Sequence, residues 1–455
     1  MVGEVVRAVR SGNWRALVAS FIYFDHSFSV WLLLGALGPF VAEALGLSGL
    51  EKGYMVAVPV IAAAVFRINF GYLFQHWDGR IIATVGILLS LVPHAYLLLS
   101  KLLGFEVSYT DLLWMGVFLG VAGASFAVAL PMAGSNYPKE YQGLVLGLAA
   151  AGNVGAVLDG VLFPPLAELI GWEWAFVASS VLLFVALALV LAWAKDATAK
   201  GERSLRPWLA FFATLTFTAV AAVGFAEGWF GVSPSVGKLL LPVAGALFAV
   251  LLMPPVWRRV FLERDTWVLM LAYSITFGGF VGMSSYVAML LTDAYGVSKV
   301  EAGLLMSLFA FTGALIRPLG GFVADKVSGA TAVPLFVAGI ALVNLAFALF
   351  TPPLALATVL FLLLYTFYGL GNGAVFQLVP HRWPDKTGLM TGIVGAAGGI
   401  GGFYLPTVNG LVYDYTGSYN LAFLLFGLVA LFGVAVFLLL HRSYKEWSSV
   451  GGKEN

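Results

Sequence analysis

Two stretches of sequence decide the fold: FRINFGYLFQHWDGR at residues 66–80 and IRPLGGFVADKVSGA at residues 316–330. They align with Arg67 opposite Arg317, an offset of 250 residues. Further landmarks repeat at offsets between 245 and 250, namely Gly71 with Gly321, Gly79 with Gly329, Pro138 with Pro384 and Gly147 with Gly392. The chain therefore contains two copies of one unit.

The composition is that of a membrane protein. Of the 455 residues, 61% are hydrophobic and 10% are charged, and the mean hydropathy is +0.95. A soluble domain would be about one quarter charged. Apolar stretches of about 20 residues recur along the chain, and each is long enough to cross a bilayer as a helix. The stretches do not alternate as the strands of a β-barrel do, so the sequence predicts an all-α polytopic membrane protein.

We expect fourteen membrane-spanning helices. The first six are predicted at residues 16–45, 52–75, 81–103, 109–134, 141–168 and 173–195. Two more are predicted at 207–227 and 238–255, flanked by the charged stretches AKDATAKGERSLRP and WRRVFLERD. The final six are predicted at 266–295, 300–324, 331–350, 353–380, 387–413 and 419–440.

The basic residues support this topology. With both termini in the cytoplasm, 18 of the 24 lysines and arginines fall inside and four outside, and such a bias is typical of membrane proteins. The other two, Arg67 and Arg317, lie within spans. The basic segment 1–15 lacks a signal-peptide cleavage pattern, so we interpret it as a cytoplasmic leader. We therefore expect a multi-pass protein of the cytoplasmic membrane, which in bacteria with two membranes is the inner membrane.

Two six-helix halves of one orientation are the build of a major facilitator transporter, whose substrate site lies at the midplane between the halves. We expect two pseudo-symmetric six-helix bundles, at residues 16–195 and 266–441. The central linker, residues 196–265, would carry the two extra spans, to which the sequence assigns no role.

The paired arginines lie deep in the membrane. About eight residues, or roughly 12 Å of helix, separate Arg67 from the polar end of its span near Gln75. An arginine near the midplane costs at least about 2.5–3.5 kcal/mol. One such arginine could be structural, bonded to carbonyls or a carboxylate. Two at equivalent positions of a repeat favour a symmetric site for a planar oxyanion, which guanidinium groups bind with paired hydrogen bonds.

Glycines cluster in GLVLGLAAAGNVGAVLDG (143–160) and GLMTGIVGAAGGIGGFYLP (388–406). Two interpretations are open: close packing of helices, or a smooth surface on which helices slide and a small anion approaches the backbone. The glycines concerned are Gly152, Gly155, Gly398, Gly399, Gly401 and Gly402. The amide of Asn153 could donate to an oxyanion or be satisfied in the core.

Three segments carry a family resemblance: GASFAVALPMAGSNYPKEYQGLVLGLAAAGNVG (123–155), GLGNGAVFQLVPHRWPDKTGLMTGIVGAAGGIGGFYLP (369–406) and YSITFGGFVGMSSYV (273–287). The first resembles the nitrate signature of the nitrate/nitrite porter family, and the second resembles its counterpart in the second half. The third is similar to bacterial assimilatory nitrate transporters. The resemblance implies that substrate is bound or lined by Arg67, Arg317, Asn153, Tyr273, Phe277 and Phe126.

The cytoplasmic loop after the second span departs from the family pattern. The family usually has an acidic residue at the position of Gln75 and glycine at that of Asp78, whereas the second copy keeps Asp325. We name Asp325 and Arg80 as candidates for the cytoplasmic gate loop. The departure leaves open how the first loop closes the gate.

Uptake of an anion into a negative-inside cell needs a driving ion, at about 2.3 kcal/mol per 100 mV. Asp25 is the best proton-coupling candidate, beside His26, and Asp159 is the second. The alternative is that Asp25 hydrogen-bonds within its span and never titrates. We therefore expect nitrate/proton symport, with nitrate/nitrite exchange as the alternative.

Other classes of function fit less well. No HExxH metal motif and no nucleophile–base constellation is present, so we expect neither an enzyme nor a metal or cofactor site. The chain has no cysteine, which excludes disulfides and thiolate ligands, and its net charge of +1 suggests no nucleic-acid partner. A receptor would need a signalling domain. The expected partners are nitrate or nitrite, protons and lipid, and we expect a working monomer. Another small anion, and an assimilatory or a respiratory role, stay open.

Overall fold

The computed structural model describes residues 2–383 and 387–440, apart from the side chains of residues 2–5, 139–140, 142–144, 147 and 387–388. Every regular element in these residues is helical. Fourteen helical segments are long and apolar enough to cross a membrane, which confirms the predicted number of spans. The repeat landmark Pro384 and the basic residues Lys386, Arg442, Lys445 and Lys453 lie outside the described residues.

The chain divides into two compact units. The first comprises residues 1–45 and 58–253, and the second comprises residues 46–57 and 254–455. Helix α3 (Gly49–His76) thus begins in the second unit and continues in the first. Its start is fixed within the second unit by Asp414, whose carboxylate accepts hydrogen bonds from the amides of Gly49 (2.6 Å) and Leu50 (2.7 Å).

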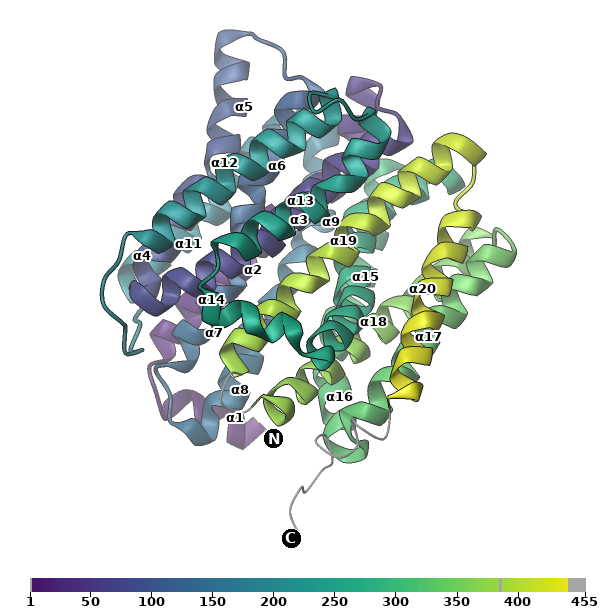
Figure 1. The fold of residues 1–455 in the computed structure, drawn as a ribbon. Helices are drawn as coiled ribbons and strands as arrows, with labels where there is room; N and C mark the ends of the chain where they lie inside the picture. The colour runs from purple at the N-terminus through teal and green to yellow at the C-terminus, as the bar shows by residue number, and fades with distance from the viewer. Residues whose placement is uncertain (1, 384–386, 441–455) are drawn as a thin grey trace. The chain divides into compact units, whose positions relative to one another are not determined.

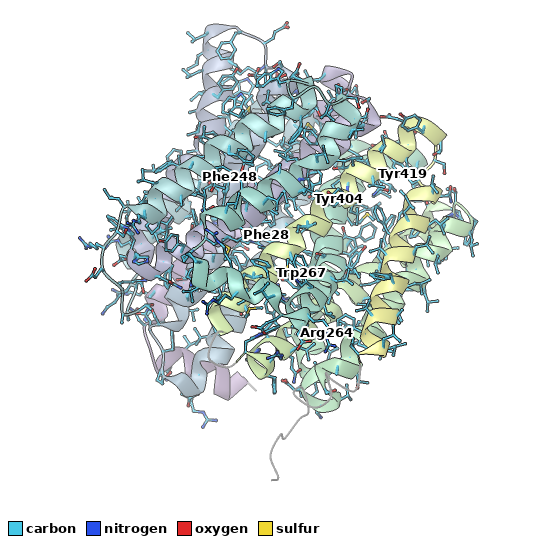
Figure 2. The ribbon with its side chains drawn as sticks, viewed as in Figure 1. Phe28, Phe248, Arg264, Trp267, Tyr404 and Tyr419 are labelled. Carbon is cyan, nitrogen blue, oxygen red and sulfur yellow. The ribbon has the colours of Figure 1, made fainter. Side chains whose placement is uncertain are left out.

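The first unit contains most of α3 and thirteen further helical elements. They are α1 (Val2–Arg10), α2 (Trp14–Leu45), α4 (Gly79–Ser90), α5 (Val92–Leu103), α6 (Tyr109–Gly123), α7 (Phe126–Gly134), α8 (Lys139–Ala150), η1 (Ala151–Val154), α9 (Gly155–Ile170), α10 (Trp172–Ala178), α11 (Ser180–Trp193), α12 (Arg206–Glu227) and α13 (Pro234–Leu252). Helix α2 packs along α9 and α11, whereas α12 lies against α6 and pairs with α13 (Figure 1). The interior is aromatic: Phe28, labelled in Figure 2, packs edge-on against Trp31 with ring centroids 5.2 Å apart.

Four of the predicted spans of this unit are interrupted. The breaks fall at Leu91, at Ala124–Ser125, in the 3₁₀ turn η1 and at Ser179. Pro93 accounts for the first break, because it stands in the first turn of α5 and has no N–H to donate to the preceding turn. The turn η1 contains Gly152 and Asn153, and such a turn inside a span often marks a functional position.

The second unit contains the start of α3 and eight further helical elements. They are α14 (Pro255–Arg258), η2 (Arg259–Leu262), α15 (Arg264–Tyr295), α16 (Lys299–Val327), α17 (Gly329–Leu349), α18 (Leu354–Arg382), α19 (Thr387–Thr416) and α20 (Asn420–Leu439). Helix α15 packs along α19, α16 along α18 and α17 along α20 (Figure 1). Glycine permits the α16–α18 contact, since a Cβ at Gly320 would overlap the carbonyl of Leu370.

The connection from α13 to α15 is short and is held by the second unit. The indole of Trp267, labelled with Arg264 in Figure 2, donates to the carbonyl of Phe261 (2.7 Å). The indole of Trp383 donates to Glu263 (2.7 Å), and Arg382 Nε donates to Asp265 (2.7 Å).

Candidate functional site

Arg67 lies in the interior of the first unit, on α3, with 3% of its surface exposed. Its Nε donates to the carbonyl of Gly123 on α6 (3.0 Å). Its guanidinium carbon lies 5.1 Å from the ring centre of Trp31 and 5.4 Å from that of Phe126. Trp31 is itself oriented by a hydrogen bond from its indole to the carbonyl of Pro59 (2.8 Å). The charge is therefore held by a carbonyl and the faces of two aromatic rings.

Small residues bring the helices close enough for this arrangement. A Cβ at Gly120 would overlap that of Ala62 on α3, and a Cβ at Gly123 would lie 2.5 Å from the Trp31 ring. Without glycine at these positions, α6 could not approach α3 and α2 so closely.

Arg317 also lies against a phenylalanine in the second unit. It is half-buried on α16, and its guanidinium carbon lies 5.9 Å from the ring centre of Phe376 on α18. Gly373 lets α18 approach α16 closely at this point, because a Cβ there would overlap the backbone carbonyl of Arg317. Gly373 and Phe376 follow Gly123 and Phe126 by the same 250 residues that separate the arginines.

Phe376 was not among the residues predicted from the sequence, although its counterpart Phe126 was. The repeat offset of 250 residues, which relates Phe126 to Phe376, was the available signal. The chain has 36 phenylalanines, however, and the contact with Arg317 is what distinguishes Phe376 from the others.

The other predicted aromatic residues of the second unit join Phe376. Tyr273 and Phe277 on α15 stack in parallel, with centroids 4.9 Å apart and an interplanar angle of 4°. Tyr273 also meets Phe376 edge-on at 4.8 Å. A Cβ at Gly398 would lie 2.7 Å from Phe277. The structure therefore brings together Arg317, Tyr273 and Phe277, and adds Phe376.

Two predicted residues of the first unit, Phe126 and Gly152, lie against the same ring of α2. Phe126 meets Phe24 of α2 edge-on at 5.5 Å, and a Cβ at Gly152 would lie 2.8 Å from Phe24. Asn153, next to Gly152 in η1, is buried with 3% exposed. Counted with the offset of 245 that applies in this part of the repeat, Gly398 stands where the first half has Asn153.

The two candidate carboxylates lie where α2 crosses α9. Gly155 lies so close to α2 that a Cβ would overlap the carbonyl of Asp25. Asp25 is 5% exposed and lies 3.0 Å from His26 Nδ1. Asp159 is fully buried, and one of its oxygens accepts a hydrogen bond from the Ser29 hydroxyl. The other oxygen of Asp159 has no hydrogen-bond partner among the described residues.

The glycines of α19 pack against α15. A Cβ at Gly401 would overlap the carbonyl of Ser274, and Gly402 lies beside both Gly278 and Gly282. Gly399 is buried in the same helix. This is the close packing that small residues permit. The sliding of these helices stays a prediction.

The loop between α3 and α4 is held by the linker segment, residues 195–204. Asp196 accepts from the amide of Gly79 (2.8 Å) at the start of α4. Lys200 bonds to Asp196 (2.6 Å) and to the carbonyl of Phe74 (2.6 Å) near the end of α3. One ion pair of the linker segment therefore satisfies backbone groups at both ends of the loop. These groups lie outside the loop, whereas the departures from the family pattern, Gln75 and Asp78, lie within it.

Further bonds extend this attachment. The Gly201 amide donates to the Gln75 carbonyl (2.9 Å), and the Trp77 indole donates to the Ser204 carbonyl (2.8 Å). Arg80 is exposed and donates to the carbonyl of Leu191. Asp325 is exposed in the last turns of α16. The gate role of Arg80 and Asp325 stays a prediction.

Asp196 is the acidic group whose charge matters in this attachment. Burial raises the pKa of its carboxyl, but hydrogen bonds from Lys200, Thr198 and the Gly79 amide outweigh burial and leave the pKa below the ordinary value of 3.8. The ionised form is therefore the form that the folded loop stabilises.

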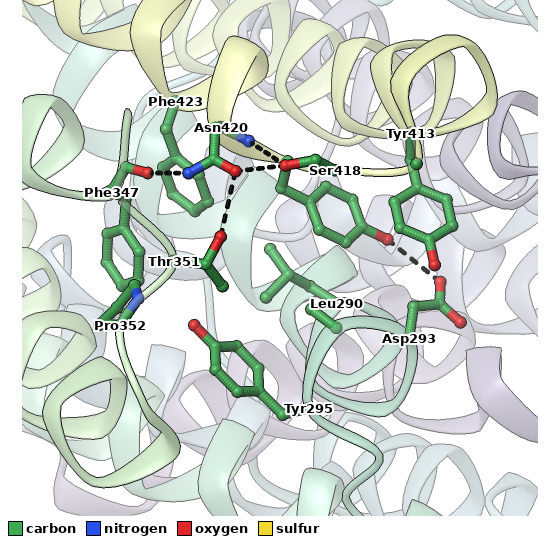
Figure 3. Close-up of a pocket in the computed structure, with 13 residues that line it drawn as sticks. Leu290, Asp293, Tyr295, Phe347, Thr351, Pro352, Tyr413, Ser418, Asn420 and Phe423 are labelled. Carbon is green, nitrogen blue, oxygen red and sulfur yellow. Dashed lines mark hydrogen bonds between the residues drawn. The ribbon is translucent and has the colours of Figure 1, made fainter. Parts of the chain in front are cut away.

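A polar pocket of about 200 Å³ lies in the second unit, near the ends of α15 and α17 and the start of α20 (Figure 3). Asp293 on its wall accepts from Tyr419 (3.1 Å) and pairs with Lys52 (3.1 Å). On another wall Asn420 bonds to the Phe347 carbonyl (2.7 Å) and to Thr351 (3.1 Å). None of the described residues that line this pocket is an arginine, so its described walls lack the groups expected for an oxyanion. Among the described residues, no group of three His, Asp or Glu side chains could hold a metal.

The model of the Major Facilitator Superfamily matches residues 19–406, which include both arginine clusters. The chain belongs to this superfamily. Its spans have the superfamily's fold: the solved structure of PepTSo, a POT family transporter, superimposes with a TM-score of 0.68 over 95% of this chain and 98% of that one, at 15% identity. This major facilitator protein is a transporter and not an enzyme.

Two curated relatives identify the family within the superfamily to which the chain belongs. It is 32% identical to a probable nitrate/nitrite transporter, NarK2, of Mycobacterium tuberculosis, over 85% of this chain and 86% of the relative. It is 30% identical to the nitrite extrusion protein of Bacillus subtilis, over 89% of this chain and 88% of the relative. The chain is a member of the nitrate/nitrite porter family within the superfamily.

Proposed function

We propose that this protein takes up nitrate across the cytoplasmic membrane by alternating access, as a nitrate/proton symporter. The observation that carries the proposal is the repeated pairing of arginine and phenylalanine. Arg67 stacks on Phe126 in one unit and Arg317 on Phe376 in the other, at the same offset of 250 residues.

The chemistry of these groups suits nitrate. Guanidinium is planar, and it bonds a planar oxyanion through paired N–H donors. Aromatic faces hold the guanidinium without taking up its donors on the edge. Each unit contributes one such group. Asn153 adds an amide donor in the first half.

A proton would supply the driving force. Anion entry against a negative interior costs about 2.3 kcal/mol per 100 mV, so co-transport of more than one proton per nitrate makes uptake favourable. Asp159 supports this idea, because it is fully buried and hydrogen-bonds only through one oxygen among the described residues. A buried carboxylate without a cation is costly in its charged form. Asp25, at the same helix crossing, is the second proton-binding candidate.

Exchange of nitrate for nitrite is the second candidate function. Its support is the name of the Bacillus subtilis relative, a nitrite extrusion protein. An exchanger needs no protonatable group, because the two anions carry the same charge. In this case Asp25 and Asp159 would be structural.

The topology follows from the same proposal. We propose six-helix bundles at 16–195 and 266–441, both termini in the cytoplasm, and a monomer as the working form. The distribution of basic residues supports the orientation.

Nitrate uptake into proteoliposomes tests the proposal. One arm imposes an inward proton gradient, and the other supplies internal nitrite without a gradient. The variants are Arg67→Lys, Asp25→Asn and Asp159→Asn, with Arg264→Lys as a control because that arginine is exposed. Symport predicts accumulation under the gradient alone, uncoupled by an aspartate variant, and little uptake by Arg67→Lys.

Two outcomes would contradict parts of the proposal. Uptake only in the presence of internal nitrite would make the protein an exchanger. Unchanged uptake by Arg67→Lys would remove this arginine from anion binding altogether.

A further inference from the structure

The extra helices α12 and α13 pack directly on the part of α3 that carries Arg67. Phe211 of α12 is fully buried and meets Phe66 edge-on, with ring centroids 5.6 Å apart and an interplanar angle of 80°. It also meets Phe70 at 5.2 Å. Both partners are buried, and they lie one residue before and three residues after Arg67.

Helix α13 contacts the same turn from a second position. A Cβ at Gly245 would lie 3.4 Å from a methyl group of Val65. Residues 65–70 of α3 are therefore covered by both inserted helices, at Val65, Phe66 and Phe70. From the same turn, Arg67 reaches the carbonyl of Gly123 on α6.

The two inserted helices, α12 and α13, also pack against each other. Phe217 of α12 and Phe248 of α13, the latter labelled in Figure 2, stack in parallel with centroids 4.1 Å apart. At one end of α12, Glu227 accepts a hydrogen bond from Thr110 of α6 (3.0 Å). Near the other end, the Trp208 ring meets that of Trp77, which follows α3, at 6.0 Å. The pair is thus fixed to α3 and α6, the two helices that hold the guanidinium.

We propose that α12 and α13 position Arg67 for the anion, and that Phe211 is the positioning residue. This inference rests on the proposed function only in that Arg67 binds the transported anion. Phe211 does not touch the guanidinium. It sets the rotation and depth of α3 by filling the space behind Phe66 and Phe70. A misplacement of about 1 Å at a binding group can cost up to a hundredfold in rate.

The decisive variant is Phe211→Ala, compared with Phe212→Ala. The two residues are adjacent and identical in type, but Phe212 is 43% exposed on the outer side of the helix. We expect Phe211→Ala to raise the KM for nitrate about tenfold with a smaller change in the maximal rate. Phe212→Ala should leave the KM unchanged. Phe211→Leu, which refills most of the volume, should restore much of the affinity.

A cross-link tests the packing without reference to nitrate. The chain has no cysteine, so Val65→Cys with Gly245→Cys places the only two thiols, and their separation suits a disulfide. A protease site inserted at Glu106, in the exposed loop between α5 and α6, separates the two cysteines in sequence. After oxidation and cleavage, the two fragments should stay joined on a non-reducing gel.

Each outcome bears on one statement. An unchanged KM in Phe211→Ala, or an equal rise in Phe212→Ala, overturns the positioning role. Fragments that separate under oxidising conditions overturn the packing of α13 on α3. If Arg67→Lys transports nitrate normally, the anion role of Arg67 fails, even where the cross-link forms.

Discussion

At the scale of single residues, the arginines are matched by their neighbours as well as by each other. Arg67 and Arg317 lie over phenylalanines that occupy the same position of the repeat, and a glycine three residues before each phenylalanine lies against the arginine. A repeat that preserved only the arginines would place a positive charge in each half. One that also preserves glycine and phenylalanine fixes the position of that charge.

Phe376 provides a test at this scale. Replacing it with alanine should raise the KM for nitrate several-fold, because a cation–π contact is worth about 0.5–2 kcal/mol. Phe126→Ala should behave alike. Phe432→Ala, at a position that is 60% exposed on α20, is the control in the uptake assay. A normal KM for Phe376→Ala would remove the ring from the site.

The arginines stand out in the sequence, and the resemblance implied several of their neighbours, but the packing behind α3 could not be predicted. A charge in an apolar span stands out, so Arg67 and Arg317 could be named from the sequence alone. Phe211 could not, since a phenylalanine that faces lipid and one that faces a neighbouring helix look the same in an apolar stretch. In a membrane both environments are apolar, so hydrophobicity does not distinguish them.

At the scale of helices, glycine sets how closely they pack. Gly155 and Gly71 form a matched pair: a Cβ at Gly155 would overlap the Asp25 carbonyl, whereas a Cβ at Gly71 would meet nothing within 4 Å. Gly155→Ala should therefore lower the stability by about 1–3 kcal/mol, as overpacking does. Gly71→Ala should be neutral or slightly stabilising. Thermal unfolding of the purified proteins in one detergent measures the difference, and equal melting temperatures would refute the close contact.

The attachment of the linker segment predicts a dependence on pH. Because the pKa of folded Asp196 lies below its ordinary value of 3.8, its carboxylate contributes stability at neutral pH. That contribution is lost as the pH falls through the folded pKa. Asp196→Asn should melt about one to a few degrees lower than the parent at pH 7. The two should converge below pH 4. Glu202→Gln, an exposed change in the same segment, is the control. A constant gap at all pH values would show that ionisation is irrelevant.

The sequence predicted the membrane-spanning helices but not the breaks inside them. Span length is dictated by a hydrocarbon core about 30 Å thick, so apolar length alone located all fourteen spans. The interruptions at Ala124–Ser125 and at η1 have no proline to announce them. They depend on how neighbouring helices satisfy the backbone, which a single sequence does not reveal.

At the scale of the whole molecule, orientation can be checked by cysteine labelling. The absence of native cysteine means that one introduced thiol reports alone. Glu106→Cys should react with an impermeant maleimide from outside intact cells. Glu202→Cys, in the linker segment, should react only in inside-out vesicles or after permeabilisation. The opposite pattern would invert the topology that the basic residues predict.

The sequence also did not reveal which unit contains the two extra spans. Charged stretches on both sides suggested a separate central linker, yet α12 and α13 belong to the first unit. Their aromatic contacts to α3 decide this grouping, and those contacts join residues about 140 positions apart in the chain.

The way the second unit begins has a consequence for the gene. The first unit ends at Met253, and the residues from Pro254 onward are already bonded to the second unit through Phe261 and Glu263. Almost no spare peptide lies between the two. A reading frame divided between codons 253 and 254 would therefore encode two polypeptides: the second keeps the connection that it holds, and the first carries residues 46–57, which pack in the second unit. Produced together in one cell, they should assemble into an active carrier, whereas a division at codon 200 would sever a segment that the first polypeptide needs.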